Sequence, residues 1–235
     1  MKHITRIALK NNKILQFASD LHLEKRSFKQ IKPNGNYLAL CGDIGNPFSK
    51  SYHDFIKDMS CNFDKVFLIS GNHEYWQNKY CMSDVDNKIT DLANNFNNVN
   101  YLNKSIVDID DYQILGCTLW SSRDILSVDN SKIRINNKNV TINDINNLHY
   151  QHVQFINENI NKPCIVLTHH LPTYQLVETK YRVGTFSKFR SLYSSNLENY
   201  IREPIYAWLC GHSHSNHSCY VNNVFCGINA RHVYI

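Results

Sequence analysis

Three short apolar runs, each followed at once by polar residues of a metal-binding type, constrain the fold of this chain more than any other feature. The runs span residues 14–18, 37–41 and 66–69. Each is almost continuously apolar, as is typical of a strand buried on both faces of a parallel sheet. The residues that follow the runs then lie in loops at the carboxyl ends of the strands. We therefore expect side chains from distant parts of the chain to meet at one edge of a sheet.

Segments with helical periodicity lie between and after these runs. Residues 52–59 and 82–96 space their apolar side chains as an amphipathic helix does, as Val85, Ile89 and Leu92 illustrate. An alternation of strands and helices favours a parallel sheet with crossover connections. The first half of the chain therefore predicts an α/β fold.

The second half predicts another sheet. Segments 105–109 and 112–117 have the pattern of a hairpin. Thr141 and Asp144 resemble a capping box and predict a helix that runs to Ile160. Further strands are expected at 164–167, 205–210, 220–221, 224–226 and 232–235. Two packed mixed β-sheets flanked by helices account for these elements.

We expect a single domain over residues 1–235, because the length suits one large core and no repeat or low-complexity linker interrupts the pattern. The 8 cysteines form no C-x-x-C pair and lie mostly in apolar runs, which predicts buried free thiols. The absence of a signal peptide or an apolar run of about 20 residues predicts a cytoplasmic protein without a membrane span. A net charge of +5 argues against dedicated nucleic-acid binding and fits a small anionic substrate.

Five motifs offer carboxylate, amide and imidazole groups in order along the chain. They are Asp20-Leu21-His22, Gly42-Asp43, Gly71-Asn72-His73-Glu74, Thr168-His169-His170 and Gly211-His212-Ser213-His214. Two divalent ions about 3.5–4 Å apart require a bridging carboxylate with oxygen and nitrogen ligands on either side. On an extended segment, Asp20 and His22 face the same way and can reach one ion. The motifs indicate a two-metal hydrolytic site.

With these motifs in this order, the chain resembles the calcineurin-like metallophosphoesterase superfamily over residues 19–230. The resemblance implies a four-layer αββα sandwich and two divalent ions. Manganese is our first expectation, and iron, zinc and nickel suit the same mixed nitrogen and oxygen ligands. The implied ligands are Asp20, His22 and His214 for one ion, Asn72, His169 and His212 for the other, and Asp43 as the bridge.

The same resemblance implies phosphoester hydrolysis, in which a hydroxide that bridges the metals attacks phosphorus in line. Asp43 and His73 are the implied catalytic residues, with His73 as the general acid at the leaving oxygen. Glu74 either fixes the tautomer of His73 or is a surface acid. We expect a phosphodiesterase that acts on nucleotide-like or other small diesters. Phosphomonoesterase and protein phosphatase activities are the alternatives.

Residues 171–190 interleave aromatic and basic side chains, a pattern that suits either nucleotide binding or a solvated loop over the site. Lys180 and Arg182 are candidates for substrate contact in this loop. Arg123 and Arg231 are further candidates for phosphate contact, and they equally suit structural ion pairs.

Two other interpretations stay open. Some proteins of this fold are interaction scaffolds with degraded ligand sets, whereas this chain keeps every ligand position and His73. Residues 210–219 also resemble, loosely, a structural zinc site of Cys and His ligands. His170 is expected to support a ligand at most, and no role is assigned to His3, His53, His149 or His152.

Overall fold

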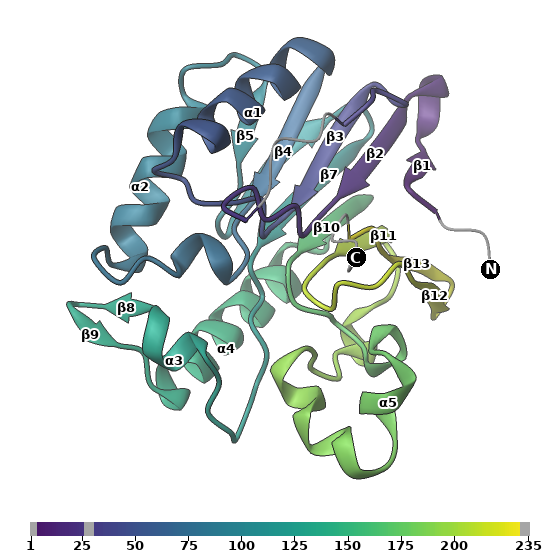
Figure 1. Ribbon diagram of the computed structural model, residues 1–235. Coiled ribbons are helices and arrows are strands. Elements are labelled where there is room, and N and C mark those ends of the chain that lie inside the picture. The colour runs from purple at the N-terminus through teal and green to yellow at the C-terminus, as the bar shows by residue number, and fades with distance from the viewer. Residues whose placement is uncertain (1–3, 26–30, 231–235) are drawn as a thin grey trace.

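The computed structural model describes residues 4–25 and 31–230. Its strands form two large sheets and a small hairpin, and helices lie outside the two sheets (Figure 1). Both large sheets combine parallel and antiparallel pairs. The predicted α/β class with two mixed sheets flanked by helices is confirmed.

The first sheet has the strand order β1-β2-β3-β4-β5, in which β2 to β5 run parallel and β1 is an antiparallel edge. Its strands are β1 (Arg6–Ala8), β2 (Ile14–Ala18), β3 (Tyr37–Cys41), β4 (Lys65–Ile69) and β5 (Val99–Tyr101). The three predicted strands are β2, β3 and β4. The pattern did not reveal β1 and β5, because strands of 3 residues are too short to show a period.

The second sheet has the order β12-β13-β11-β10-β7-β6, with antiparallel edges at β12 and β6. Its strands are β6 (Ser105–Ile109), β7 (Tyr112–Cys117), β10 (Cys164–Thr168), β11 (Ile205–Cys210), β12 (Ser218–Val221) and β13 (Val224–Ile228). The predicted hairpin is β6 and β7. The strand predicted at 232–235 lies outside the described residues.

The helices include three long ones and several short turns. They are α1 (Lys50–Asn62), α2 (Met82–Ala93), α3 (Asp129–Lys132), α4 (Ile142–Asn159) and α5 (Thr179–Arg182), with 3₁₀ helices at Lys10–Asn12, His73–Tyr75, Tyr174–Leu176, Thr185–Leu192 and Glu198–Tyr200. The small hairpin pairs β8 (Arg134–Ile135) with β9 (Lys138–Asn139). The capping box of α4 is confirmed, because Asp144 N donates to Thr141 Oγ1 while Thr141 N donates to Asp144 Oδ2. The described residues between β2 and β3, 19–25 and 31–36, contain no helix, and α1 follows β3.

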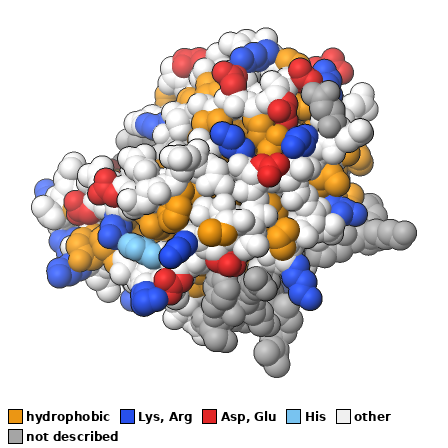
Figure 2. Space-filling view, turned by 90° about the horizontal axis from the view of Figure 1, so that it is seen from above, with side chains coloured by type: hydrophobic (Ala, Val, Ile, Leu, Met, Phe, Trp, Pro, Cys, Tyr) orange, Lys and Arg blue, Asp and Glu red, His pale blue; other side chains and the backbone are white. Residues whose placement is uncertain are grey.

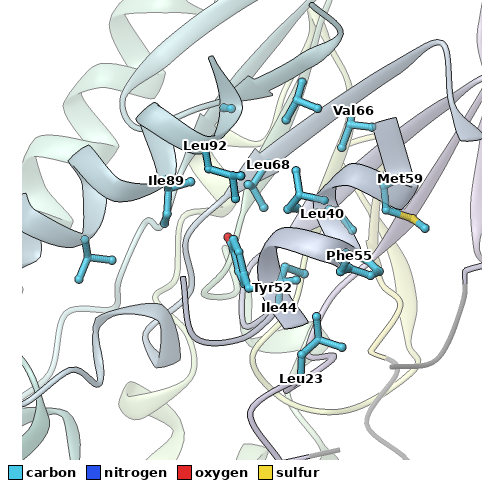
Figure 3. Packing of buried hydrophobic residues seen from close by; sticks show 14 of the residues in the cluster. Leu23, Leu40, Ile44, Tyr52, Phe55, Met59, Val66, Leu68, Ile89 and Leu92 are labelled. Carbon is cyan, nitrogen blue, oxygen red and sulfur yellow. The ribbon is translucent and has the colours of Figure 1, made fainter. Parts of the chain in front are cut away.

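Alternating side chains along the buried strands divide the core into layers. In β3, Ala39 belongs to the cluster between the two sheets, whereas Leu38 and Leu40 belong to the cluster beneath α1 and α2. Figure 3 shows Leu40 in this outer cluster together with Tyr52 and Phe55 of α1. Full burial of one such side chain stabilises the fold by roughly 1.5–3 kcal/mol. Packing on both faces holds the strands, and hence the loops at their ends, in fixed positions.

The two sheets are joined where their central strands end. Ser19 N, just after β2, donates to Asn229 O, just after β13, at 3.0 Å. Thr118 Oγ1, just after β7, donates to Ser70 O, just after β4, at 2.9 Å. The carboxyl ends of both sheets therefore meet, and every motif singled out in the sequence lies in this region.

One face of the molecule has no dominant charge. Figure 2 shows basic and acidic side chains interspersed on the face seen from above. Among the described helices, none combines the length and apolar character needed to cross a lipid bilayer. All 8 cysteines are free, but Cys61 is exposed and Cys219 half-buried, so the prediction of buried thiols holds only for the others.

Candidate active site

The residues predicted to bind metal ions converge at the junction of the two sheets. In two groups, the candidate ligand atoms all lie within 4.8 Å of one another. The groups are Asp20, His22, Asp43 and His214, and Asp43, His169 and His212. Asn72 Oδ1 lies 3.1 Å from His169 Nε2 and so adjoins the second group. Asp43 belongs to both groups, as a bridging residue must.

The backbone turns sharply at these positions. Left-handed φ angles occur at Asp20 (56°), His22 (50°), Asp43 (55°), His212 (69°) and His214 (52°). The extended segment expected between Asp20 and His22 is therefore absent. Each such residue costs about 1–3 kcal/mol and persists only where its surroundings enforce it. Here the rigid strands before each turn provide that constraint, and the turns direct the side chains into one space.

Glycines allow the loops to approach one another closely. Gly42 has a φ of 81°, and a Cβ there would lie 2.6 Å from His169 Nδ1. A Cβ on Gly71 would collide with Asp43 Oδ1, and one on Gly211 would lie 2.9 Å from Asp20 Oδ2. No side chain fits at these points without displacing a candidate ligand.

In three imidazoles, one ring nitrogen contacts an oxygen at the margin of the cluster. The other ring nitrogen faces the centre of the cluster. The outward contacts are His22 Nδ1 to Glu24 Oε1 (3.0 Å), His169 Nδ1 to Cys41 O (2.8 Å) and His212 Nε2 to Leu192 O (3.1 Å). An N–H donated to such an oxygen leaves a lone pair on the inward nitrogen, which is the form that binds metal ions.

The inward-facing atoms fit cations between them. His22 Nε2 lies 3.1 Å from His214 Nε2, and His212 Nδ1 lies 3.2 Å from His169 Nε2. Asp43 Oδ2 is buried and has no hydrogen-bond partner among the described residues. Buried polar atoms without partners are costly, and a cation removes that cost. The donor set therefore fits divalent metal ions.

The buried carboxylates of the cluster also favour positive charge nearby. Burial raises the pKa of Asp20 to about 6. Burial likewise opposes ionisation of Asp43, but His169 and the other facing imidazoles hold its pKa well below the usual range. Burial lowers the pKa of His169, yet the carboxylates of Asp43 and Asp20 raise it to about 9 overall. In the protein alone, protons on histidines compensate the buried carboxylates, and bound cations would replace them.

His73 and Glu24 lie beside the first group. Glu24 Oε1 is 3.0 Å from His22 Nδ1 and 3.6 Å from His73 Nδ1. Burial disfavours the carboxylate, but the two facing imidazoles lower the pKa of Glu24 to about 2. The ring of His73 stacks on Trp76 at 3.7 Å, and His73 Nε2 lies 4.0 Å from Asp43 Oδ2. The motifs do not include Glu24, although its spacing of two residues from His22 is a signal present in the sequence.

Glu74 has neither of its predicted roles. Its buried carboxylate accepts hydrogen bonds from Asp43 N (2.9 Å), Ile44 N (2.6 Å) and Gly71 N (2.8 Å). Burial and the nearby Asp43 carboxylate raise the pKa of Glu74 to about 7, although these N–H groups favour the ionised form. Glu74 thus holds the Asp43 loop rather than the His73 ring.

Asp129 is the other residue that sequence reasoning missed. Its Oδ1 accepts hydrogen bonds from Asn72 Nδ2 and Trp76 Nε1, both at 2.9 Å, and its Oδ2 accepts one from Arg123 Nη1 at 3.0 Å. Burial opposes ionisation, but Arg123 lowers the pKa of Asp129. Because Asp129 holds the amide nitrogen of Asn72, the amide oxygen faces the second group.

A cavity of about 440 Å³ opens over the cluster. Its walls come from the segment before α3 and from the α5 segment, which project from the same end of the molecule (Figure 1). Apolar and aromatic side chains on the walls are Trp76, Val128, Val177, Tyr181, Leu192 and Tyr193. The cluster therefore lies at the base of a pocket suited to a small molecule.

The predicted substrate contacts differ in their positions. Arg123 and Lys180 line the cavity, and Arg182 is not among its lining residues. Lys180 pairs with Glu178 at 2.8 Å, and both side chains are exposed. Arg231 lies outside the described residues.

Comparison with known proteins agrees with this geometry. The model of the family described as calcineurin-like phosphoesterase matches residues 17–216. The chain belongs to the calcineurin-like phosphoesterase family. As a member, it is a metal-dependent phosphoester hydrolase, which confirms the predicted family and enzyme class.

Relatives of this phosphoesterase match over most of its length. Uncharacterized protein L509 of Acanthamoeba polyphaga mimivirus is 31% identical over 256 residues, covering 92% of this chain and 90% of L509. The structure of phosphopantetheinyl hydrolase (PptH) from Mycobacterium tuberculosis has a TM-score of 0.68 at 12% identity, covering 92% of this chain and 88% of PptH. TT1561 of Thermus thermophilus has a TM-score of 0.61 at 10% identity, with coverage of 92% and 88%. At such identities the two structures show a shared fold.

Three further histidines of the phosphoesterase lie outside the two groups of candidate ligands. His152 Nδ1 accepts a hydrogen bond from Leu119 N at 2.9 Å, and His149 Nδ1 lies 3.1 Å from Leu119 O, so both residues of α4 hold the left-handed turn at Leu119 and Trp120. The ring of His170 is buried and packs 4.0 Å from that of His212. Among the described residues, no cysteine joins the groups of potential metal ligands, which argues against the structural zinc site.

Proposed function

We propose that this phosphoesterase binds two divalent ions and hydrolyses small, nucleotide-like phosphodiesters. The position of Asp43 is the observation that carries the proposal, because this carboxylate belongs to both groups of ligand atoms. Asp20, His22 and His214 would hold one ion, and Asn72, His169 and His212 the other. Asp43 would contact both. Manganese is the first candidate, and iron, zinc or nickel suit the same ligands.

Two ions bound in this way supply Lewis-acid chemistry, since they lower the pKa of water and neutralise charge on phosphoryl oxygens. The protein's own residues hold the metal ligands in position. Glu74 holds the loop that carries Asp43, and Asp129 holds the amide of Asn72. These contacts fix the donors before the substrate arrives, which removes the cost of reorganising them.

His73 is the proposed general acid. Its ring lines the cavity between Trp76 and Glu24, and its Nε2 lies on the side of Asp43. A proton held at Nε2 would pass to the leaving oxygen as the phosphorus–oxygen bond breaks. Such a group typically accelerates a reaction by roughly 10²–10⁴-fold.

The cavity favours a small substrate. Its volume of about 440 Å³ falls within the roughly 300–1,000 Å³ that is common for small-molecule sites. Trp76, Tyr181 and Tyr193 offer aromatic surface for a base or another planar group. The name of PptH points to a phosphopantetheinyl group as a second substrate to examine.

The experiment compares esters and metals directly. Metal-stripped protein receives Mn, Fe, Zn, Ni or Mg in turn and is assayed on bis-p-nitrophenyl phosphate, p-nitrophenyl phosphate, cyclic nucleotides, a phosphopantetheinyl ester and a phosphopeptide. The proposal predicts metal-dependent turnover with a preference for diesters. Faster hydrolysis of the monoester or the phosphopeptide would favour the corresponding alternative. Tight binding of an unrelated protein, with no turnover of any ester, would favour an interaction scaffold.

A further inference from the structure

Arg123 has an unusual environment for a buried arginine. Arg123 is among the residues that line the cavity, and its side chain is fully buried. Nη1 donates to Asp129 Oδ2 at 3.0 Å and also to Ser127 Oγ. Nε and Nη2 are buried and have no hydrogen-bond partner among the described residues. Among the described residues, the Nη1 group of the guanidinium is therefore hydrogen-bonded, whereas the edge formed by Nε and Nη2 is not.

The unpaired side has the geometry of an anion site. Nε–H and one Nη2–H point in the same direction and form a planar fork that matches two oxygens of a phosphate. Leaving two buried cationic donors unpaired is costly, and an anion that reaches them from the cavity would remove that cost. Arg134, which does not line the cavity, leaves only Nε without a partner among the described residues, whereas Arg123 leaves both donors of one edge without one.

Asp129 places this fork beside the metal ligands. The same carboxylate that accepts from Arg123 Nη1 accepts from Asn72 Nδ2 through its other oxygen. Asn72 in turn contacts His169. The guanidinium thus lies one carboxylate away from a candidate ligand of the second ion.

We infer that the Nε and Nη2 fork of Arg123 binds two oxygens of the phosphoryl group that the enzyme attacks. This assignment rests on the proposed two-metal function and adds a protein cation to the groups that hold the phosphate. Lys180 is less suited, because it is exposed and paired with Glu178. Arg123 therefore selects for phosphate through shape as well as charge.

The test uses Arg123→Lys, which keeps a positive charge and loses the fork. The affinity for inorganic phosphate is measured as competitive inhibition and by calorimetry, at saturating metal and with the bound metal quantified. We expect phosphate to bind about 10–100-fold more weakly to the variant, with metal content unchanged. Arg134→Lys is the matched control, since Arg134 in β8 follows α3, donates to Asn78 O at 3.1 Å and does not line the cavity.

Three outcomes would overturn the inference. Phosphate affinity equal to that of the wild type is the first. A weakened affinity that recovers once metal occupancy is complete is the second, because Arg123 would then act only by holding Asp129. If the variant does not fold, a crystal structure of the metal-loaded wild-type protein with phosphate is the test. Contacts of about 2.7–2.9 Å from Nε and Nη2 to phosphate oxygens would support the inference. Phosphate bound away from these two atoms is the third outcome that would overturn it.

Failure of the proposed function is distinguishable from failure of this inference. If the wild-type protein hydrolyses no ester with any metal, the proposed function fails, yet calorimetry with phosphate still reports on Arg123. If the wild-type protein hydrolyses esters and Arg123→Lys binds phosphate equally well, the inference alone fails.

Discussion

Asp43 Oδ1 accepts a hydrogen bond from the backbone N–H of His73 at 2.8 Å. The proposed bridging ligand and the proposed general acid are therefore fixed to each other across the loops that follow β3 and β4. A displacement of either loop would change both the metal cluster and the position of the His73 ring.

Asp43→Asn tests the bridge. The amide removes one negative charge from between the two ions, so we expect loss of at least one ion and a fall in turnover of about 10³-fold, on the order of several kcal/mol of transition-state stabilisation. Turnover and metal content by mass spectrometry are the measurements. Asp64→Asn is the control, because Asp64 is an exposed carboxylate paired with Lys13. Full turnover of the Asp43 variant in metal-controlled buffer would falsify the mechanism.

His73→Gln tests the general acid. For an ester with a poor leaving group, we expect kcat to fall by roughly 10²–10⁴-fold, because the leaving oxygen then departs without a proton. For a p-nitrophenyl ester, whose leaving group needs no proton, the loss should be much smaller. His53→Gln on α1 is the control. Equal losses for both leaving groups would argue that His73 acts by binding rather than by proton transfer.

Glu24→Gln tests the orientation of the imidazoles. The amide retains the shape of the carboxylate but attracts the N–H groups of His22 and His73 more weakly, so we expect a reduction of about 10–100-fold in metal affinity or turnover. Metal titration and kcat are measured together. The exposed pair of Lys50 and Asp54 offers Asp54→Asn as the control. Wild-type values for both quantities would remove Glu24 from the site.

His152→Gln tests a stability effect that is separate from catalysis. Burial lowers the pKa of His152 to about 3 in the folded state, whereas an unfolded chain has its ordinary value of 6.5. Between these values the unfolded state holds the additional proton, so stability falls as the pH decreases from 6.5 toward 3. When the pH is lowered from about 7 to about 5, this residue should reduce the free energy of unfolding of the wild-type protein by about 2 kcal/mol.

Urea unfolding of the wild type and of His152→Gln at about pH 7 and about pH 5 measures this difference. The glutamine retains an acceptor for Leu119 N–H, so the variant should lose about 2 kcal/mol less over the same pH interval. The prediction fails if both proteins lose the same stability.

Some elements were predictable because their burial leaves a pattern in the sequence. Strands β2, β3 and β4 pack on both faces and so appear as apolar runs, and α4 begins at a capping box whose two residues are near neighbours. The short strands β1 and β5 have no such pattern, since they form by pairing with neighbours distant in sequence. The extended segment predicted at Asp20 and His22 was wrong, because the loops fold around a shared centre and force left-handed turns.

The sequence by itself determined the kinds of donor groups, their order and the family. These are local properties, because each motif joins a strand end to one or two ligand types. Only the tertiary structure decided which nitrogen of each imidazole faces inward, since the oxygens of Cys41 and Leu192 reach His169 and His212 through folding alone. The same reason explains Asp129, whose partner Asn72 is 57 residues away. Asp129 stands in no motif, so its role became recognisable only once the fold supplied its donors.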